Sequence, residues 1–288
     1  MKKRDVYYFL GPKTRRIFRR LYFFPIDIYE KITSKRDRMA PPKGKVFIGS
    51  GDFIKQGQDI LRQLIDLGGV KPNHRVLDIG CGIGRLAIPL TKYLDEKGSY
   101  EGFDIVESGI TWCKNNIQSK FPKFNFFHVD LRNDLYNLET KSQCTSYAFT
   151  YKTDEFGFVF LTSVFTHMMP EDVSSYLTQI NKVLKNDGIC FSTFFIMNDK
   201  STSLMKMSDG IQFDYDFTNY YLHNIKVKEA NVAFKEDYLD HLIISKGFEI
   251  IEKHYGYWSG RKKDETVDFQ DIYILKKNGM KSNVVLSN

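Results

Sequence analysis

One stretch of the sequence, Arg75-Val76-Leu77-Asp78-Ile79-Gly80-Cys81-Gly82-Ile83-Gly84, joins a short apolar strand to a glycine-rich turn. Helical periodicity follows from Arg85 to Leu94. Glycines at such a turn let the chain bend tightly and let a ligand approach the backbone, and the N-terminus of the next helix offers unpaired N–H groups. The stretch therefore predicts a ligand site at the carboxyl end of a buried strand.

Strands and helices alternate on both sides of this turn. Further strands are expected at 100–105, 124–129, 156–161 and 188–197, with closing strands at 248–254 and 269–275. Helices are expected at 53–67, 85–94, 108–118, 171–184 and 235–245. This order predicts an α/β fold with an open, doubly wound sheet flanked by helices. Residues 198–234 show no clean period, and we expect them to form an insertion on the substrate side.

The N-terminal segment, residues 1–45, is strongly basic. It holds 14 Lys and Arg against 4 Asp and Glu, so it carries +10 while the whole chain carries +7. The apolar residues that recur there at helical spacing are Ile17, Leu21, Phe24 and Ile28. Pro25 is expected to kink or divide this helix. The stripe predicts packing on the main domain or, because basic amphipathic helices bind anionic surfaces, contact with a membrane or an acidic partner.

Composition limits the remaining possibilities for this chain of 288 residues. The four cysteines have neither C-x-x-C nor zinc-site spacing, which predicts reduced thiols in a cytoplasmic protein without a metal site. No apolar run reaches the roughly 18 residues of a membrane span. We expect a main domain at 46–280 and a tail at 281–288.

The spacing of the glycines separates two classes of ligand. A dinucleotide-binding turn reads G-x-G-x-x-G, and its third glycine would fall on Arg85. Here the pattern is Asp-x-Gly-x-Gly-x-Gly, and its acidic residue, Asp78, suits a cationic amino group better than a pyrophosphate. Asp104 ends the second expected strand, where a carboxylate can accept both hydroxyls of a ribose. Asp130-Leu131 follows the third, where it can bind adenine, although Asp also caps helices and starts turns.

Residues 75–277 resemble the class I (Rossmann-like) S-adenosylmethionine-dependent methyltransferases, and among them the bacterial enzymes that act on small molecules. The stretch from Val76 to Gly84 is similar to that family's motif I. Gly102-Phe103-Asp104 resembles its acidic second-strand motif, and His128-Val129-Asp130 its adenine-side motif. The resemblance implies S-adenosylmethionine as the cofactor and a seven-stranded sheet whose last strand is antiparallel.

The resemblance also implies where the cofactor lies. Asp78, Gly80 and Gly82 would line its methionine end, Asp104 its ribose, and Asp130 with Leu131 its adenine. The full set of residues expected at the cofactor is Asp78, Gly80, Cys81, Gly82, Gly84, Arg85, Asp104, Ile105, Asp130, Leu131, Thr162 and Ser163.

His167 is the candidate general base, because it follows the fourth expected strand and a histidine can be neutral near pH 7. The alternative is a helix cap or a packing role. Tyr257, Trp258 and Arg261 are the candidate acceptor-binding residues, since aromatic rings with an arginine suit a sugar or another polar ring. The same residues are also typical of ordinary core and surface. The glycine-containing segment 47–53 is a candidate lid over the cofactor.

Three functions are compatible with these features. The first is O-methylation of a small molecule or glycan, which includes a lipid-linked glycan reached at a membrane surface through the basic arm. The second is methylation of RNA or protein, in which the basic N-terminal segment binds the macromolecule. Nucleic acid is the less expected partner, because the cations lie in the N-terminal segment and not around the expected site. The third is cofactor binding without catalysis.

Overall fold

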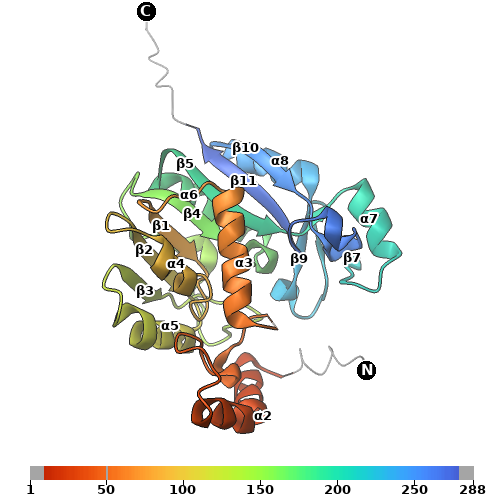
Figure 1. Cartoon of the computed structure of the whole chain (residues 1–288). Coiled ribbons are helices and arrows are strands. Elements are labelled where there is room, and N and C mark those ends of the chain that lie inside the picture. Colours follow the sequence, from red (N-terminus) through yellow and green to blue (C-terminus); the bar gives the residue numbers. More distant parts are fainter. Residues whose placement is uncertain (1–9, 50, 279–288) are drawn as a thin grey trace, which may run out of the picture.

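The computed structural model describes residues 10–49 and 51–278, and its centre is a seven-stranded sheet (Figure 1). The strands of this sheet are β1 (Arg75–Ile79), β2 (Ser99–Asp104), β3 (Phe124–His128), β4 (Phe156–Leu161), β5 (Leu184–Phe194), β10 (Phe248–His254) and β11 (Asp271–Lys277). Their order is β3-β2-β1-β4-β5-β11-β10. β1 to β5 run parallel, and β11 runs antiparallel to both β5 and β10. The predicted doubly wound sheet with an antiparallel last strand is confirmed.

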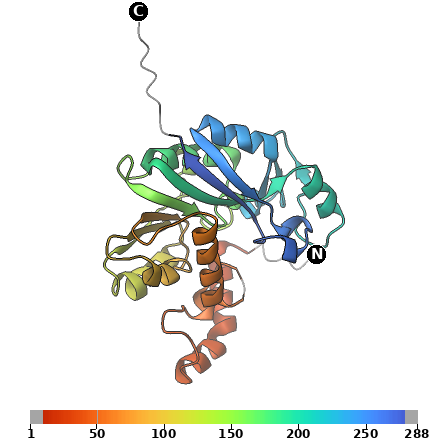
Figure 2. The ribbon, with the colours of Figure 1, turned by 45° about the horizontal axis from the view of Figure 1, so that its top comes forward.

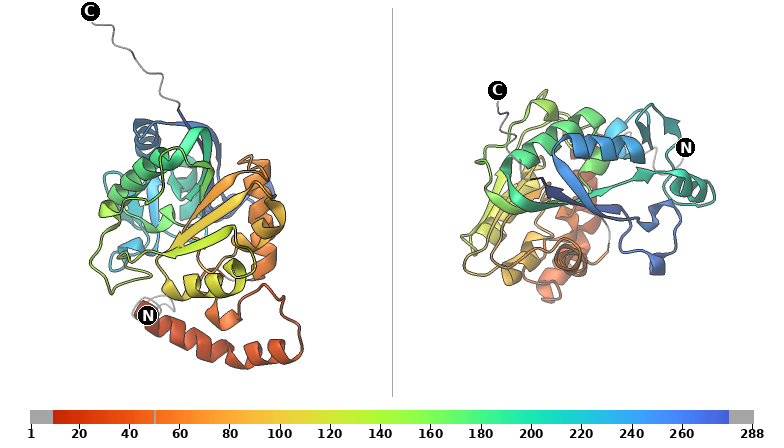
Figure 3. Two further views of the ribbon diagram at one scale, coloured as in Figure 1. Left: turned by 90° about the vertical axis from the view of Figure 1, so that its left-hand side faces the viewer. Right: turned by 90° about the horizontal axis from the view of Figure 1, so that it is seen from above.

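Helices cover both faces of this sheet (Figure 3). On one face lie α3 (Phe53–Asp66), α4 (Ala87–Tyr93), α5 (Glu107–Cys113) and the π-helical turn η2 (Lys114–Gln118). On the other lie α6 (Pro170–Val183) and α8 (Glu236–Ser245). Val76 packs with the first group and Leu77 with the second, because successive side chains of a strand point to opposite faces. The central strands β1, β2 and β4 are therefore buried on both sides.

Residues 196–235 include a second, smaller sheet, although the sequence shows no clean period over 198–234. Its strands, in spatial order, are β6 (Ile196–Met197), β9 (Val232–Lys235), β8 (Tyr220–Leu222) and β7 (Tyr215–Asp216). The helix α7 (Asp199–Lys206) accompanies them (Figure 2). The strands are two to four residues long, which is too short for an alternating pattern to show in the sequence.

The N-terminal segment forms α2 (Pro12–Ile32), a single helix that lies outside the layers of the main domain (Figures 1 and 3). Of the two outcomes expected at Pro25, a kink or a division, the structure rules out the division, because Pro25 lies inside one continuous helix. Proline removes one N–H and leaves the carbonyl of Leu21 unpaired, but both residues are exposed, so solvent can satisfy that carbonyl. The expectation that the apolar stripe packs on the main domain is also wrong, because none of the residues of α2 is buried. The expected tail at 281–288 lies outside the described residues.

Candidate active site

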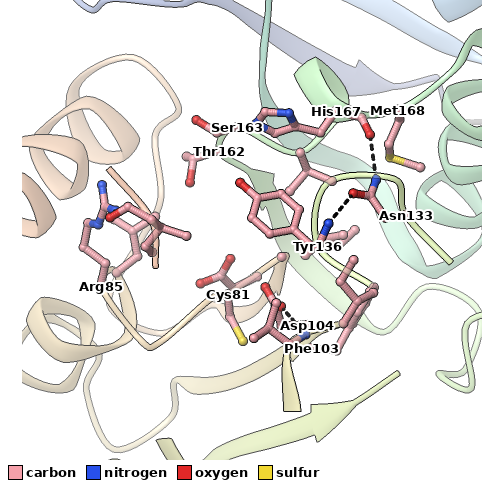
Figure 4. A pocket seen from close by; sticks show the side chains of 18 of the residues that line it. Cys81, Arg85, Phe103, Asp104, Asn133, Tyr136, Thr162, Ser163, His167 and Met168 are labelled. Atoms are coloured by element: carbon pink, nitrogen blue, oxygen red, sulfur yellow. Dashed lines mark hydrogen bonds between the residues drawn. The ribbon is translucent and has the colours of Figure 1, made fainter. Parts of the chain in front are cut away.

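A cavity of about 280 Å³ lies at the carboxyl ends of β1, β2 and β4 (Figure 4). Its walls include Asp78 in β1 and Gly80 just after it, residues 104–106 at the end of β2, and residues 162–164 after β4. The strand order reverses between β1 and β4, and open α/β sheets bind their ligands at such a switch point. The cavity is therefore where the fold itself predicts a site.

The glycine-rich turn brings the backbone close to the cavity. Gly80 has φ of +77°, and a Cβ on it would lie 2.3 Å from Cγ2 of Val164. Only glycine fits this position. The Asp78 carboxylate before it is buried and accepts a hydrogen bond of 2.7 Å from the hydroxyl of Tyr100. Burial raises the pKa of Asp78 to about 8, although the Tyr100 hydrogen bond opposes this. A buried carboxylate in a cavity wall suits a cationic ligand group.

Asp104 joins the glycine-rich turn to the end of β2. One carboxylate oxygen accepts from the amide of Gly82 at 2.8 Å and the other from the amide of Val106 at 2.7 Å. Burial raises the pKa of this carboxyl, and the two amide hydrogen bonds oppose the rise. A carboxylate has about four acceptor sites, so further lone pairs remain for ligand hydroxyls.

Arg85 and the segment before α3 close one side of the cavity. Phe47, Ile48 and Gly49 line it, and Nη2 of Arg85 donates to the carbonyl oxygen of Ile48 at 2.8 Å. The next residue of the expected lid, Ser50, lies outside the described residues. Nε of Arg85 is buried, and no hydrogen-bond partner for it exists in the described part of the chain. An anionic group in the cavity would satisfy this arginine.

His167 ends the 3₁₀ turn η4 (Phe165–His167) and lines the same cavity. Its Nδ1 lies 3.0 Å from the carbonyl oxygen of Glu229, in η5 (Lys228–Ala230). A carbonyl oxygen only accepts, so Nδ1 carries the proton and Nε2 of the neutral ring holds a lone pair. Burial lowers the pKa of His167, which favours the neutral ring. Burial also raises the pKa of the Glu229 carboxyl to about 7.

Two residues at the centre of the site were not predicted from the sequence. Figure 4 shows the ring of Tyr136 projecting into the cavity between His167 and Asp104. Asn133 ties this loop to the histidine, because its Nδ2 donates to the carbonyl oxygen of His167 at 3.0 Å. Its Oδ1 accepts from the amide of Tyr136 at 3.1 Å. The asparagine turn was the one available signal, since Asn side chains often bond the backbone two or three residues on.

Not every expected cofactor residue lies at the cavity. The expected residues that do line it are Asp78, Gly80, Cys81, Arg85, Asp104, Ile105, Thr162 and Ser163. Gly82 and Gly84 only shape the turn behind it. Asp130 and Leu131 line a neighbouring depression, where Nδ2 of Asn137 donates to the Asp130 carboxylate at 2.9 Å. The structure thus places Ile105 and Val106, rather than the Asp130 carboxylate, at the cavity beyond Asp104.

The aromatic and arginine set expected to bind the acceptor lies elsewhere. Trp258 is buried in a separate cluster, and its Nε1 donates to Asp271 at 2.7 Å. Arg261 donates to Oγ of Ser259 and stacks on Tyr255. Tyr257 packs edge-on against Phe269. None of the three expected residues lines the cavity, because the loop after β10 folds against the small sheet and α3 instead.

Residues 70–247, more than half of the chain, match the model of a family described as a methyltransferase domain. The chain belongs to the class I S-adenosylmethionine-dependent methyltransferases. The methyltransferase therefore uses S-adenosylmethionine as its cofactor, as the glycine-rich turn predicted. The cavity fits that cofactor, since it combines buried carboxylates, a backbone turn without a Cβ and a buried arginine nitrogen.

The curated relatives of this methyltransferase act on different kinds of acceptor. The 23S rRNA (uracil(1939)-C(5))-methyltransferase RlmD of Shewanella sediminis is 36% identical over 89 residues, which cover 30% of this chain and 20% of that protein. The 2-phytyl-1,4-naphtoquinone methyltransferase of Nostoc sp. is 30% identical over 102 residues, which cover 35% of this chain and 43% of that protein. The chain thus matches less than half the length of these relatives.

Solved structures share the fold. The PH0226 protein of Pyrococcus horikoshii superposes with a TM-score of 0.54 at 13% identity, over 82% of this chain and 95% of that one. Magnesium protoporphyrin IX methyltransferase of Synechocystis, solved with S-adenosylhomocysteine, superposes with a TM-score of 0.50 at 16% identity. That match covers 88% of this chain and 99% of the other.

Within residues 10–49 and 51–278, no helix is long and apolar enough to cross a membrane. The same residues hold no group of three or more His, Cys, Asp or Glu side chains placed to bind a metal ion. The four cysteines are free and buried.

Proposed function

We propose that this methyltransferase transfers a methyl group to a hydroxyl group of a small molecule with a largely apolar body. The observation that carries the proposal is the hydrogen bond from His167 to the carbonyl of Glu229, which leaves Nε2 unprotonated at a cavity wall. A neutral imidazole can act as the general base that accepts the proton of an alcohol or phenol.

Three polar and two apolar side chains would hold the cofactor, which supplies an electrophilic methyl group on a sulfonium when it is bound. The Asp78 carboxylate would pair with the ammonium of the methionine end, and Arg85 with its carboxylate. Asp104 would accept the ribose hydroxyls with the lone pairs that the two amides leave free. The apolar side chains of Ile105 and Val106 would lie beside the adenine.

The chain's own contribution to the reaction is orientation and one proton transfer. His167 would take the proton of the acceptor hydroxyl at Nε2 while that oxygen forms its bond to the methyl carbon, and the electron pair of the broken sulfur–carbon bond would remain on the cofactor sulfur. The resulting imidazolium stays bonded to the Glu229 carbonyl, which favours the charged ring. Tyr136 and Asn133 would position the acceptor against the histidine.

The walls near His167 favour an apolar acceptor body. Tyr136, Val164, Met168 and Tyr176 line the cavity together with His167, and the Tyr136 ring packs edge-on against the imidazole. Apolar walls with a few polar groups are typical of small-molecule sites. The features that favoured a saccharide, Trp258 and Arg261, lie away from the cavity, so we propose an apolar or aromatic alcohol in place of a glycan.

Methylation of RNA or protein is the second candidate, because several curated relatives, RlmD of Shewanella sediminis among them, are named as 23S rRNA methyltransferases. The cavity disfavours a carbon acceptor that needs a thiolate nucleophile. Cys81 and Cys144 line it, but burial raises the pKa of both thiols, that of Cys144 to about 12. Such thiols are almost wholly protonated near neutral pH.

The experiment that tests the proposal follows a labelled methyl group. Purified enzyme is incubated with methyl-labelled S-adenosylmethionine and a cell extract, which is then separated into organic-soluble, aqueous, RNA and protein fractions. We expect label in the organic-soluble fraction that survives mild alkali, because ethers resist alkali and esters do not. Label in RNA or protein overturns the proposal. Phenols with matched amine analogues then test the acceptor atom, and equal or faster transfer to the amines contradicts O-methylation.

A further inference from the structure

The helix α2 is bound to the domain by its charged side. Side chains of Arg15 and Arg16 donate to the backbone carbonyls of Leu135 and Tyr136. On the same side, the Asp27 carboxylate accepts from the amides of Lys43 and Gly44, both in η1 (Lys43–Lys45). Polar contacts of this kind orient a helix without burying its apolar side chains.

The opposite side of α2 is apolar and open. At 100° per residue these side chains fall on one face, spanning somewhat less than half of the helix circumference. The large apolar residues on that face are Ile17, Phe18, Leu21, Tyr22, Phe24, Ile28, Tyr29 and Ile32. Leu21 is 66% exposed, Tyr22 75% and Ile32 77%. An exposed apolar patch of this size marks an interaction surface.

The exposed charges of residues 10–45 are almost all positive, although Lys13 also pairs with Glu139 of the domain. Among residues 10–45, seven Lys and Arg are exposed, and Asp37 is the one exposed acidic residue in that described range. The exposed cations are Lys13, Arg20, Lys31, Lys35, Arg38, Lys43 and Lys45. Asp27 and Glu30 are turned toward η1, where Lys43 pairs with Glu30. An apolar face bordered by cations complements a surface that is apolar inside and anionic at its boundary.

We propose that α2 is a membrane-surface anchor, whose apolar face enters the headgroup boundary of an anionic lipid bilayer. A helix of this length offers a stripe about 30 Å long and about 10 Å wide, which is small for a dimer interface of about 800 Å² per partner. The border of cations would also repel the identical border of a second copy. An anionic bilayer is compatible with both the small area of the apolar stripe and the positive charges beside it.

This position couples the membrane to the active site. Tyr136, whose carbonyl accepts from Arg16, lines the cavity, and Phe47 lies two residues after η1. The helix thus rests on two segments that border the cavity. A bilayer bound to α2 lies about one helix diameter, about 10 Å, from them. If the proposed function holds, the acceptor is an amphiphile taken from the bilayer surface.

Vesicle sedimentation of the full chain tests the anchor independently of catalysis. We expect binding to phosphatidylcholine vesicles with about 30% phosphatidylglycerol, little binding to pure phosphatidylcholine, and loss of binding at about 0.5 M salt. The double substitution Phe18→Ser and Leu21→Ser removes two exposed side chains and is expected to weaken binding at least about tenfold. The matched control, Ile244→Ser with Ile251→Ser, removes two exposed apolar residues on α8 and β10 and is expected to bind as the wild type does.

Three results overturn the anchor: no binding to anionic vesicles, equal binding by the Phe18/Leu21 variant, or a dimer in sedimentation velocity that this variant dissociates. The last result would show that the apolar face of α2 binds a second copy of the chain. Affinity for S-adenosylhomocysteine is expected to be equal in all these variants, which shows that each is folded. Because vesicle binding needs no acceptor, its outcome is separate from that of the labelled-methyl experiment.

Discussion

Nδ1 of His167 lies 3.0 Å from the carbonyl oxygen of Glu229, so the backbone of η5 sets the tautomer of the histidine at the cavity. Replacing His167 by Asn keeps an N–H donor for that carbonyl but removes the base. We expect kcat to fall about 100-fold or more, with an unchanged dissociation constant for S-adenosylmethionine. Because burial lowers the pKa of His167, kcat of the wild type should be flat through neutral pH and decline only below the ordinary histidine pKa of about 6.5.

The matched control for this prediction is His241→Asn, which changes an exposed histidine on α8. Equal kcat in the wild type and His167→Asn would assign His167 a purely structural role. A loss of cofactor affinity in His167→Asn without a change in kcat would assign it to the cofactor instead.

The buried carboxyl of Asp78 predicts proton release on cofactor binding. With a pKa of about 8 it is mostly protonated at pH 6, and pairing with an ammonium requires the carboxylate. Affinity for S-adenosylhomocysteine should therefore rise with pH from about 6 to about 8 and level off above that. Calorimetry in buffers of different ionisation enthalpy should report the released proton. Asp78→Asn should bind more weakly and lose the proton release; a variant that keeps it would locate the proton elsewhere.

Substitutions at two glycines distinguish the cost of a left-handed backbone from the cost of a steric clash. Gly69 has φ of +66° with no atom within 4 Å of a built Cβ, whereas at Gly80 that Cβ would lie 2.3 Å from Val164. Gly69→Ala should lower the free energy of unfolding by about 1–2 kcal/mol, the cost of a left-handed alanine. Gly80→Ala should lower it further and weaken cofactor binding at least about tenfold. Thermal unfolding and calorimetry measure both, and equal behaviour of the two variants would contradict the described turn.

The indole of Trp258 is predicted to stabilise the fold rather than to bind the acceptor. Its Nε1 donates to Asp271, which also accepts from the amides of Ile196 and Gly256. Trp258→Phe should lower the free energy of unfolding by about 1–3 kcal/mol, because a buried acceptor loses one partner. The KM for the acceptor should not change. A raised KM at unchanged stability would restore Trp258 to the acceptor site.

The sheet could be predicted from the sequence because its strands are continuous apolar runs. The expected strands at 75–79, 156–161 and 248–254 have the bounds of β1, β4 and β10. Buried parallel strands give this signal directly, and the glycine turn then placed Asp78 and Asp104 at the same edge of the sheet.

Three features could not be predicted from the sequence, each for a physical reason. The helical period of α2 shows an apolar stripe but does not show which side of the helix contacts the domain. That side is set by the hydrogen bonds of Arg15 and Arg16 to the domain backbone. The strands β7 and β8 exist because β7 pairs with β8 and β8 pairs with β9, not because of their own sequence pattern. Tyr136 reaches the cavity through the turn at Asn133, a tertiary placement that spacing does not encode.

The most direct test of the central claim, that the cavity at the ends of β1 and β2 holds the cofactor, is the dissociation constant of S-adenosylhomocysteine for the wild type, Asp104→Asn and Asp104→Ala. The amide oxygen of Asn can still accept one hydroxyl, so its affinity should lie between the other two. Asp104→Ala should bind at least about tenfold more weakly than the wild type. Equal affinity of folded Asp104→Ala and wild type would contradict the assignment of this cavity.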